Sequence, residues 1–203
     1  MLKVESKYKI CKRLGSEVFE KCQTQKFTLA EARAAANKKR GRKNQSDYGR
    51  RLLQKQKLRY AYGLYERQLR RYVEDAKRTG SANPTERLYQ LLEMRLDNVV
   101  YRMGLAPTRR MARQLVSHGH VLVNKRKSTV PSHALSVSDV ISVREGSKTK
   151  GPFLVQDEKE TSAVPGWISI NEKDLSATIK SVPALVPGES PFDFVQILEF
   201  YSR

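Results

Sequence analysis

The spacing of apolar residues predicts helices through the first half of the chain. Over residues 47–77 apolar positions recur at helical intervals, so we expect one long helix, or two that join near Gly63. A second apolar stripe over residues 88–103 predicts one buried helical face, which starts after a capping Asn83 and stops at Gly104. Residues 1–45 show no such stripe and are expected to be an irregular, basic extension.

The pattern changes after residue 104. Thr108 is suited to cap a short helix that ends at Gly119, and strands are expected at 120–123, 127–130 and 140–143. Asn124–Lys125 predicts the turn between the first two strands. Residues 88–145 are therefore expected to form two helices followed by a small sheet.

The last part of the chain gives weaker signals. Residues 167–170 alternate as a strand does, prolines interrupt the segment that follows, and residues 194–201 are expected to form a final apolar strand. The fold class predicted from these elements is α+β.

The balance of charges points to a polyanionic partner. The net charge is +18, of which residues 1–80 contribute +15, residues 81–150 contribute +7 and residues 151–203 contribute −4. Because like charges repel in a compact state, so much positive charge is most simply explained by nucleic acid bound to the first two-thirds of the chain.

Two classes of chemistry find little support. Cys11 and Cys22 are too few for a disulfide framework or a four-ligand metal site, so we expect reduced thiols, no metal and no cofactor. No apolar run is long enough to span a membrane and the first residues lack the apolar stretch of a signal peptide, so we expect a cytoplasmic protein without a membrane partner.

Cations gather in three segments, and each is a candidate RNA-binding element because guanidinium and ammonium groups bind phosphate and Arg also stacks on bases. The helical region contributes Arg50, Lys55, Lys57, Arg59, Arg67, Arg70 and Arg71. The short helix and the hairpin, expected to converge on one concave surface, contribute Arg109, Arg110, Arg113, Lys125, Arg126 and Lys127, with His118 and His120 at its rim. The run at 37–44 contributes Lys38, Lys39, Arg40, Arg42 and Lys43.

Three stretches carry a resemblance to a known family. MRLDNVVYRMGLAPTRRMARQLVSHGHVLVNKRKSTVPS resembles the RNA-binding module of bacterial small-subunit ribosomal protein four. SDYGRRLLQKQKLRYAYGLYERQLRRYVEDA is similar to the helical region of that family, and ILEFYSR is similar to its C-terminus. The module alone occurs in several RNA enzymes, so the helical region and the C-terminus make the resemblance specific.

The resemblance implies a fold and a role. It implies a helical domain at 46–87, completed by 146–203, with the RNA-binding module inserted at 88–145 and the basic extension 1–45 in front. It implies a non-enzymatic protein that binds the 5′ domain of 16S-type small-subunit rRNA, nucleates assembly and lies by the mRNA entry path. It also implies that the chain contacts a neighbouring ribosomal protein at an interface tied to decoding accuracy. An organellar ribosome is the alternative to a cytoplasmic one.

The same resemblance adds residues to the RNA-binding set. Positions that match the family pattern include Tyr48, Gln56, Arg95, Arg102, Gln114, His118, Gly119 and Asn124, and the module also holds Thr108 and His120. The front of the chain departs from the family, because many relatives carry four zinc-binding cysteines where this chain has two. We therefore expect no zinc.

Two other functions compete with this one. A pseudouridine synthase can carry the same module, and Arg95–Leu96–Asp97 is similar to a catalytic triplet of such enzymes. The triplet lies within the leucine stripe, however, so Asp97 is better interpreted as an ion-pair partner for a nearby Arg. A DNA-binding helix-turn-helix is the second alternative, because the helices expected at 88–103 and 109–117 flank Gly104.

Overall fold

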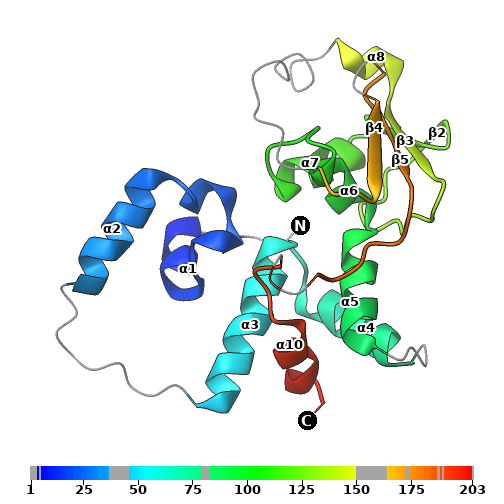
Figure 1. The fold of residues 1–203 in the computed structure, drawn as a ribbon. Helices are drawn as coiled ribbons and strands as arrows, with labels where there is room; N and C mark the ends of the chain where they lie inside the picture. The colour runs from blue at the N-terminus through cyan, green and yellow to red at the C-terminus, as the bar shows by residue number, and fades with distance from the viewer. Residues whose placement is uncertain are drawn as a thin grey trace. The chain divides into compact units, whose positions relative to one another are not determined.

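The computed structural model divides the chain into two compact units, shown in Figure 1. The first comprises residues 1–88 and 185–203, and the second comprises residues 89–184. The structure describes residues 4, 6–36, 46–78, 83–149, 164–171, 174–186, 188 and 190–202. The second unit is thus inserted in sequence within the first, and residues 1–88 and 185–203 belong to the same unit.

The first unit is helical. Its helices are α1 (Lys7–Leu14), α2 (Gln25–Ala36), α3 (Asp47–Ala61), α4 (Glu66–Arg78), the start of α5 (Pro84–Glu93) and α10 (Phe194–Phe200), with 3-10 turns at Ser16–Val18 and Glu20–Cys22. The expected break near Gly63 is present between α3 and α4. Residues 7–36 are largely helical, so the prediction of an irregular front was wrong there.

The front of the chain also corrects the expectation of reduced thiols. Cys11 in α1 and Cys22 after it are joined by a disulfide, and both are fully buried. They lie in an apolar cluster with Val18, Phe19 and Phe27, against which Leu53 and Tyr60 of α3 pack. The bridge therefore closes a short loop inside a core that α3 completes.

The C-terminal segment forms a helix rather than the predicted strand. The side chain of Asp193 caps α10 by accepting a hydrogen bond from the Gln196 amide at 3.0 Å. Helix α10 then packs along α3, with Phe194 and Ile197 buried. The apolar residues of this segment fit a helix because one stripe of them meets α3.

The second unit contains the end of α5, then α6 (Leu96–Arg102), α7 (Arg109–Ser117), the one-turn α8 (Glu145–Lys148) and an antiparallel sheet. The strands are β1 (Val121–Val123), β2 (Arg126–Lys127), β3 (Val140–Val143), β4 (Ile168–Asn171) and β5 (Ser176–Ile179), in the order β2-β1-β3-β5-β4. Helices α6 and α7 cover one face of this sheet (Figure 1) and share its core. The predicted α+β class is confirmed.

Two boundaries in this unit differ from expectation. The single helical face predicted for 88–103 is broken between α5 and α6, because Arg95 forms an isolated bridge with Ala134. The amide of Leu96 donates to the carbonyl of His133, and that of Leu135 donates to the carbonyl of Met94. The sheet also extends beyond residue 145, since β5 pairs with β3 and β4 with β5, so only the final residues rejoin the helical unit.

Candidate nucleic-acid interface

Helix α4 presents a row of arginines along a hollow of about 490 Å³. The hollow is lined by Arg67, Arg70, Arg71, Glu74, Asp75 and Arg78. Arg70 is paired with Glu74 at 2.9 Å and Arg78 with Asp75 at 3.2 Å, whereas Arg67 and Arg71 form no ion pair with any residue that the structure describes. These two guanidinium groups are exposed and available to a phosphate ligand.

Arg78 is a candidate that the sequence interpretation omitted. Its side chain is 85% exposed, and it lies seven residues after Arg71 and eleven after Arg67. Those intervals place the three residues on one face of a helix. The spacing is visible in the sequence, but Arg78 lies one residue beyond the helical segment predicted at 47–77.

Lys55 was predicted to contact RNA, but its side chain is engaged within the protein. It is buried, with its ammonium group 2.8 Å from the carboxylate of Glu66 and 4.5 Å from the centre of the Phe200 ring. The hydroxyl of Tyr201 donates to the same carboxylate at 2.7 Å, and Arg59 lies 3.8 Å from it. Lys55 therefore joins α3, α4 and the C-terminal residues.

This cluster shifts two pKa values in opposite directions. Burial opposes ionisation of Glu66, but hydrogen bonds from Lys55 and Tyr201 and the charges of Lys55 and Arg59 outweigh it, so the pKa of Glu66 is lowered. Burial and the hydrogen bond to Glu66 both raise the pKa of the Tyr201 hydroxyl. A carboxylate and a neutral phenol are thus the stable forms at neutral pH.

The other candidates on α3 differ in what they contact. Arg50 is exposed and paired with Asp47. Tyr48 is half exposed, with its ring 5.6 Å from that of Phe200. Lys57 and Gln56 are partly buried, and Gln56 lines a second hollow. The predicted residues of the run at 38–43 lie outside the residues that the structure describes.

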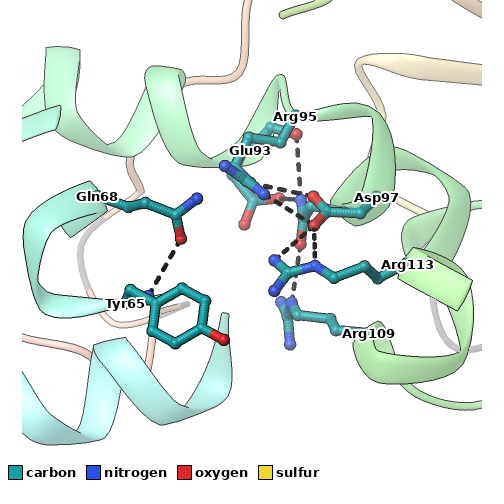
Figure 2. A network of polar contacts seen from close by, with 8 residues as sticks. Tyr65, Gln68, Glu93, Arg95, Asp97, Arg109 and Arg113 are labelled. Carbon is teal, nitrogen blue, oxygen red and sulfur yellow. Dashed lines mark hydrogen bonds and ion pairs between the residues drawn. The ribbon is translucent and has the colours of Figure 1, made fainter. Parts of the chain in front are cut away.

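In the second unit, two of the predicted RNA-binding residues meet at a buried carboxylate. Figure 2 shows Arg95 and Arg113 converging on Asp97. Arg95 donates to the two carboxylate oxygens at 3.0 and 2.8 Å, and Arg113 donates to Oδ2 at 2.8 and 2.6 Å. The side chains of Arg95 and Asp97 are only 3% and 5% exposed. The interpretation of Asp97 as an ion-pair partner is confirmed.

A second buried carboxylate organises the remaining arginines. Glu93 is fully buried and accepts hydrogen bonds from Arg102 at 2.9 and 3.1 Å and from the amide of Asn98 at 3.0 Å. The carbonyl of that amide accepts from Arg109 at 2.8 Å, and the Arg109 guanidinium also lies 4.5 Å from the Tyr101 ring centre. Arg95, Arg102, Arg109 and Arg113 thus hold α6 and α7 in place.

The exposed cations predicted to bind RNA in this unit lie on α7 and on the β1–β2 hairpin. Thr108 caps α7 by accepting a hydrogen bond from the Met111 amide at 3.1 Å, which identifies it as a helix cap. Arg110, Gln114 and His118 are exposed, as are Lys125, Arg126 and Lys127. None of these four cations forms an ion pair with another part of the chain that the structure describes.

Gly119 brings the hairpin against the end of α7. Its φ of +73° favours glycine, and a Cβ there would lie 2.1 Å from Cε of Lys127. His120 follows, with Nδ1 2.9 Å from the Ser147 hydroxyl. Gly119 and His120, both predicted to bind RNA, thus sit where helix and hairpin meet.

The geometry therefore separates the predicted residues by exposure and pairing. One group is exposed without an ion-pair partner among the described residues, and a second is buried in networks that fix the helices. Arg50 and Arg70 are exposed but paired with carboxylates of their own helices. Within the described residues no cluster of three His, Cys, Asp or Glu side chains could hold a metal ion, and no helix is long and apolar enough to cross a membrane.

Comparison with known proteins agrees with this arrangement. Residues 3–93 match the ribosomal protein S4/S9 N-terminal domain, and residues 94–141 match the S4 domain. The chain is 45% identical to small ribosomal subunit protein uS4 of Cutibacterium acnes over 165 residues, which cover 81% of this chain and 82% of that protein. The chain belongs to the uS4 family of small ribosomal subunit proteins.

Two further relatives show how far the similarity extends. The uS4 protein of Roseiflexus castenholzii is 42% identical over 96% of both chains. The protein uS4c of Oltmannsiellopsis viridis is 46% identical over 78% of both chains. The similarity thus covers both units.

Membership in the uS4 family establishes the broad function. The chain is a structural, RNA-binding constituent of the small ribosomal subunit, and the prediction that it is not an enzyme is confirmed. The buried Asp97, held by two arginines, has the role of an ion-pair partner rather than that of a catalytic carboxylate.

Proposed function

We propose that this chain binds the 5′ domain of small-subunit rRNA as a primary binder that nucleates assembly. The observation that carries the proposal is the set of exposed cations without an ion-pair partner among the described residues: Arg67 and Arg71 on α4, Arg110 on α7, and Lys125, Arg126 and Lys127 on the hairpin. Cations held on short helices and a hairpin suit the phosphates of folded RNA.

Binding through several phosphates should depend steeply on salt. For about 6–10 contacts, the affinity should fall about a thousandfold or more between about 50 and 200 mM salt, by analogy with DNA. The isolated 5′ domain of the rRNA is the probe, and filter binding with tRNA and duplex DNA as competitors is the assay. If either competitor displaces the 5′ domain at moderate salt, the charge is generic and the proposal fails.

The α4 row is tested by a double substitution. Arg67→Ala with Arg71→Ala should weaken binding and lower the slope of log affinity against log salt by about 2, because each phosphate contact contributes about one. Lys9→Ala with Lys180→Ala removes the same charge from exposed positions outside the proposed surface and is the matched control. Equal losses for both double variants would contradict a localised surface on α4.

The finer role includes mRNA and a neighbouring protein. By resemblance to the family, we infer that the chain lies by the mRNA entry path and shares with that neighbour an interface that influences decoding accuracy. The basic run at 37–44 is the candidate for the mRNA contact. Replacing its five cations with Ser should reduce crosslinking to mRNA in assembled subunits while leaving binding to the 5′ domain intact, and unchanged crosslinking would contradict this assignment.

A further inference from the structure

The tip of the β1–β2 hairpin has an unusual backbone for its sequence. Both turn residues have positive φ, 49° at Asn124 and 65° at Lys125. This combination is typical of the two-residue type I′ turn that best matches the twist of a hairpin. Asn adopts this conformation readily, but Lys does not. Other contacts must therefore help to hold Lys125 in place.

The side chain of Asn124 provides such contacts. Its Nδ2 donates to Oδ1 of Asp139 at 2.7 Å, and its Oδ1 accepts from the Val140 amide at 2.9 Å. The main-chain amide of Asn124 donates to the Val140 carbonyl at 2.8 Å. Three hydrogen bonds thus fasten the turn to the start of β3, and both ends of the Asn124 amide are engaged within the protein.

Asp139 is itself held in a second turn. Its Oδ2 accepts from the Ser136 amide at 2.7 Å, and Ser138 beside it has a φ of 74°. The carbonyl of Asp139 accepts from the amide of Ile179, and the amide of Ser138 donates to the carbonyl of Ile179. A continuous set of hydrogen bonds therefore runs from the end of β5 through Asp139 to Asn124.

Three adjacent cations follow this anchored residue. Lys125, Arg126 and Lys127 are exposed, and the side chain of Lys127 lies beside Gly119 at the end of α7. The short basic strand is thus held at Asn124 by side-chain hydrogen bonds, and along Arg126 and Lys127 by its pairing with β1. A segment held in this way loses little conformational freedom when it binds.

We propose that Asn124 and Asp139 form a positioning clamp that presents Lys125, Arg126 and Lys127 to phosphates of bound RNA. The inference rests on the proposed function, in which this basic strand contacts rRNA. It changes the role of Asn124, which was predicted to contact RNA and is here a positioning residue. The ligand class is the sugar-phosphate backbone, read by charge and spacing.

Two substitutions of Asn124 distinguish the loss of its side-chain hydrogen bonds from a change in the conformation of the turn. Asn124→Ala removes the clamp and disfavours positive φ, whereas Asn124→Gly removes the clamp but keeps a residue suited to positive φ. Neither changes the net charge. Both should lower the affinity of the full-length chain for the isolated 5′ domain rRNA about tenfold, and both should lower the salt slope, because a loosened strand meets fewer phosphates at once.

The second hairpin of the sheet supplies a matched control. Asn171 donates to Asp174 at 2.7 Å in the same kind of exposed Asn–Asp pair, but at the β4 edge of the sheet, opposite the β2 edge. Asn171→Ala should leave affinity and salt slope unchanged. Thermal unfolding followed by the fluorescence of Trp167, the only tryptophan in the chain and part of this unit, checks that each variant is folded.

The triple variant Lys125→Ala, Arg126→Ala, Lys127→Ala distinguishes failure of the clamp from failure of the proposed function. If the triple variant binds as tightly as the parent, the proposed function of this strand is wrong. If the triple variant binds weakly but the Asn124 variants match the parent, only the clamp is wrong. A positioning role requires that Asn124→Ala cause no further loss in the triple background, so an additive loss would overturn it, as would an equal loss in Asn171→Ala.

Discussion

The substitution Asp97→Ala should strongly destabilise the second unit. The carboxylate is 5% exposed and accepts four hydrogen bonds from the guanidinium groups of Arg95 and Arg113, themselves 3% and 14% exposed. Removing it leaves two largely buried positive charges without their common partner. Breaking a buried ion pair in this way typically costs about 3–5 kcal/mol, because a buried charge loses the carboxylate that compensated its removal from water.

This cost is large relative to the stability of a small domain. A domain is stable by about 5–15 kcal/mol, and 1 kcal/mol shifts the Tm of a 60–100-residue domain by about 4–8 °C. The Tm of the second unit should therefore fall by at least about 12 °C. Trp167 packs against the core of this unit, so thermal unfolding followed by its fluorescence reports on the unit in the intact chain.

An exposed ion pair provides the comparison. Glu74 pairs with Arg70 on α4, where the side chains are 61% and 71% exposed, and such pairs contribute about 0.3–0.5 kcal/mol. Glu74→Ala should leave the overall Tm nearly unchanged in circular dichroism. If Asp97→Ala lowers the Tm by no more than Glu74→Ala does, the buried ion pair stabilises the unit no more than an exposed pair, and the reasoning is refuted.

Three further predictions concern single features of the fold. Reducing the Cys11–Cys22 bridge, or replacing Cys22 with Ser, should lower the stability of the first unit by about 3 kcal/mol in urea unfolding, because the unfolded chain regains the freedom of a 12-residue loop. Because the pKa of Glu66 is lowered by folding, its contribution to stability is present above its ordinary pKa of 4.5 and is lost as pH falls through its folded value. Melting curves from about pH 7 to about pH 3 should therefore show a smaller acid-induced loss in Glu66→Gln. Gly119→Ala should destabilise the second unit by at least about 1–2 kcal/mol, from its positive φ and the displaced Lys127 stem, measured by Trp167 fluorescence.

Each of these predictions has its own control. Gly104 also has a positive φ of 77° but has no atom within 4 Å of its missing Cβ, so Gly104→Ala measures the backbone effect alone. A Gly119→Ala loss no larger than that of Gly104→Ala would mean that the contact with Lys127 is unimportant. A reductant should not lower the stability of the Cys22→Ser variant any further, because that variant has no bridge to break. Unchanged urea unfolding of the reduced parent would contradict the stabilising role of the bridge. Parallel pH profiles for Glu66→Gln and the parent would contradict the assigned role of Glu66.

The sequence predicted the helices and strands that are specified by apolar residues close together in the chain. Helices α3, α4 and α7 and strands β1 and β3 follow from apolar spacing and turn residues near in the chain. The break at Arg95 was not predicted, because it arises from hydrogen bonds to residues 131–135, which no local pattern reveals. Strand β5 was missed because its sequence, Ser-Ala-Thr-Ile, is only weakly apolar and obtains its partners from β3 and β4.

The candidate site was predicted in composition but not in detail. A sequence shows that a residue is cationic but not whether its side chain is exposed. Residue type alone therefore does not distinguish the exposed Lys125 from the buried Lys55 and Arg95. Burial depends on how the fold places the partner carboxylates: Glu66 of the next helix meets Lys55, and Asp97 is shared by Arg95 and by Arg113 of α7. The Cys11–Cys22 bridge likewise depends on a fold that brings two separated thiols together.

The position of α10 has a consequence for synthesis. Residues 89–184 form their unit from a continuous stretch, so this unit can fold as soon as that stretch has been translated. The helical unit begins earlier, but it needs the packing of α10 on α3 and the hydrogen bond from the Tyr201 hydroxyl to Glu66. Both depend on residues that are translated after the inserted unit. A chain that stops before residue 194 would therefore contain the complete inserted unit but a helical unit without the helix that packs on α3.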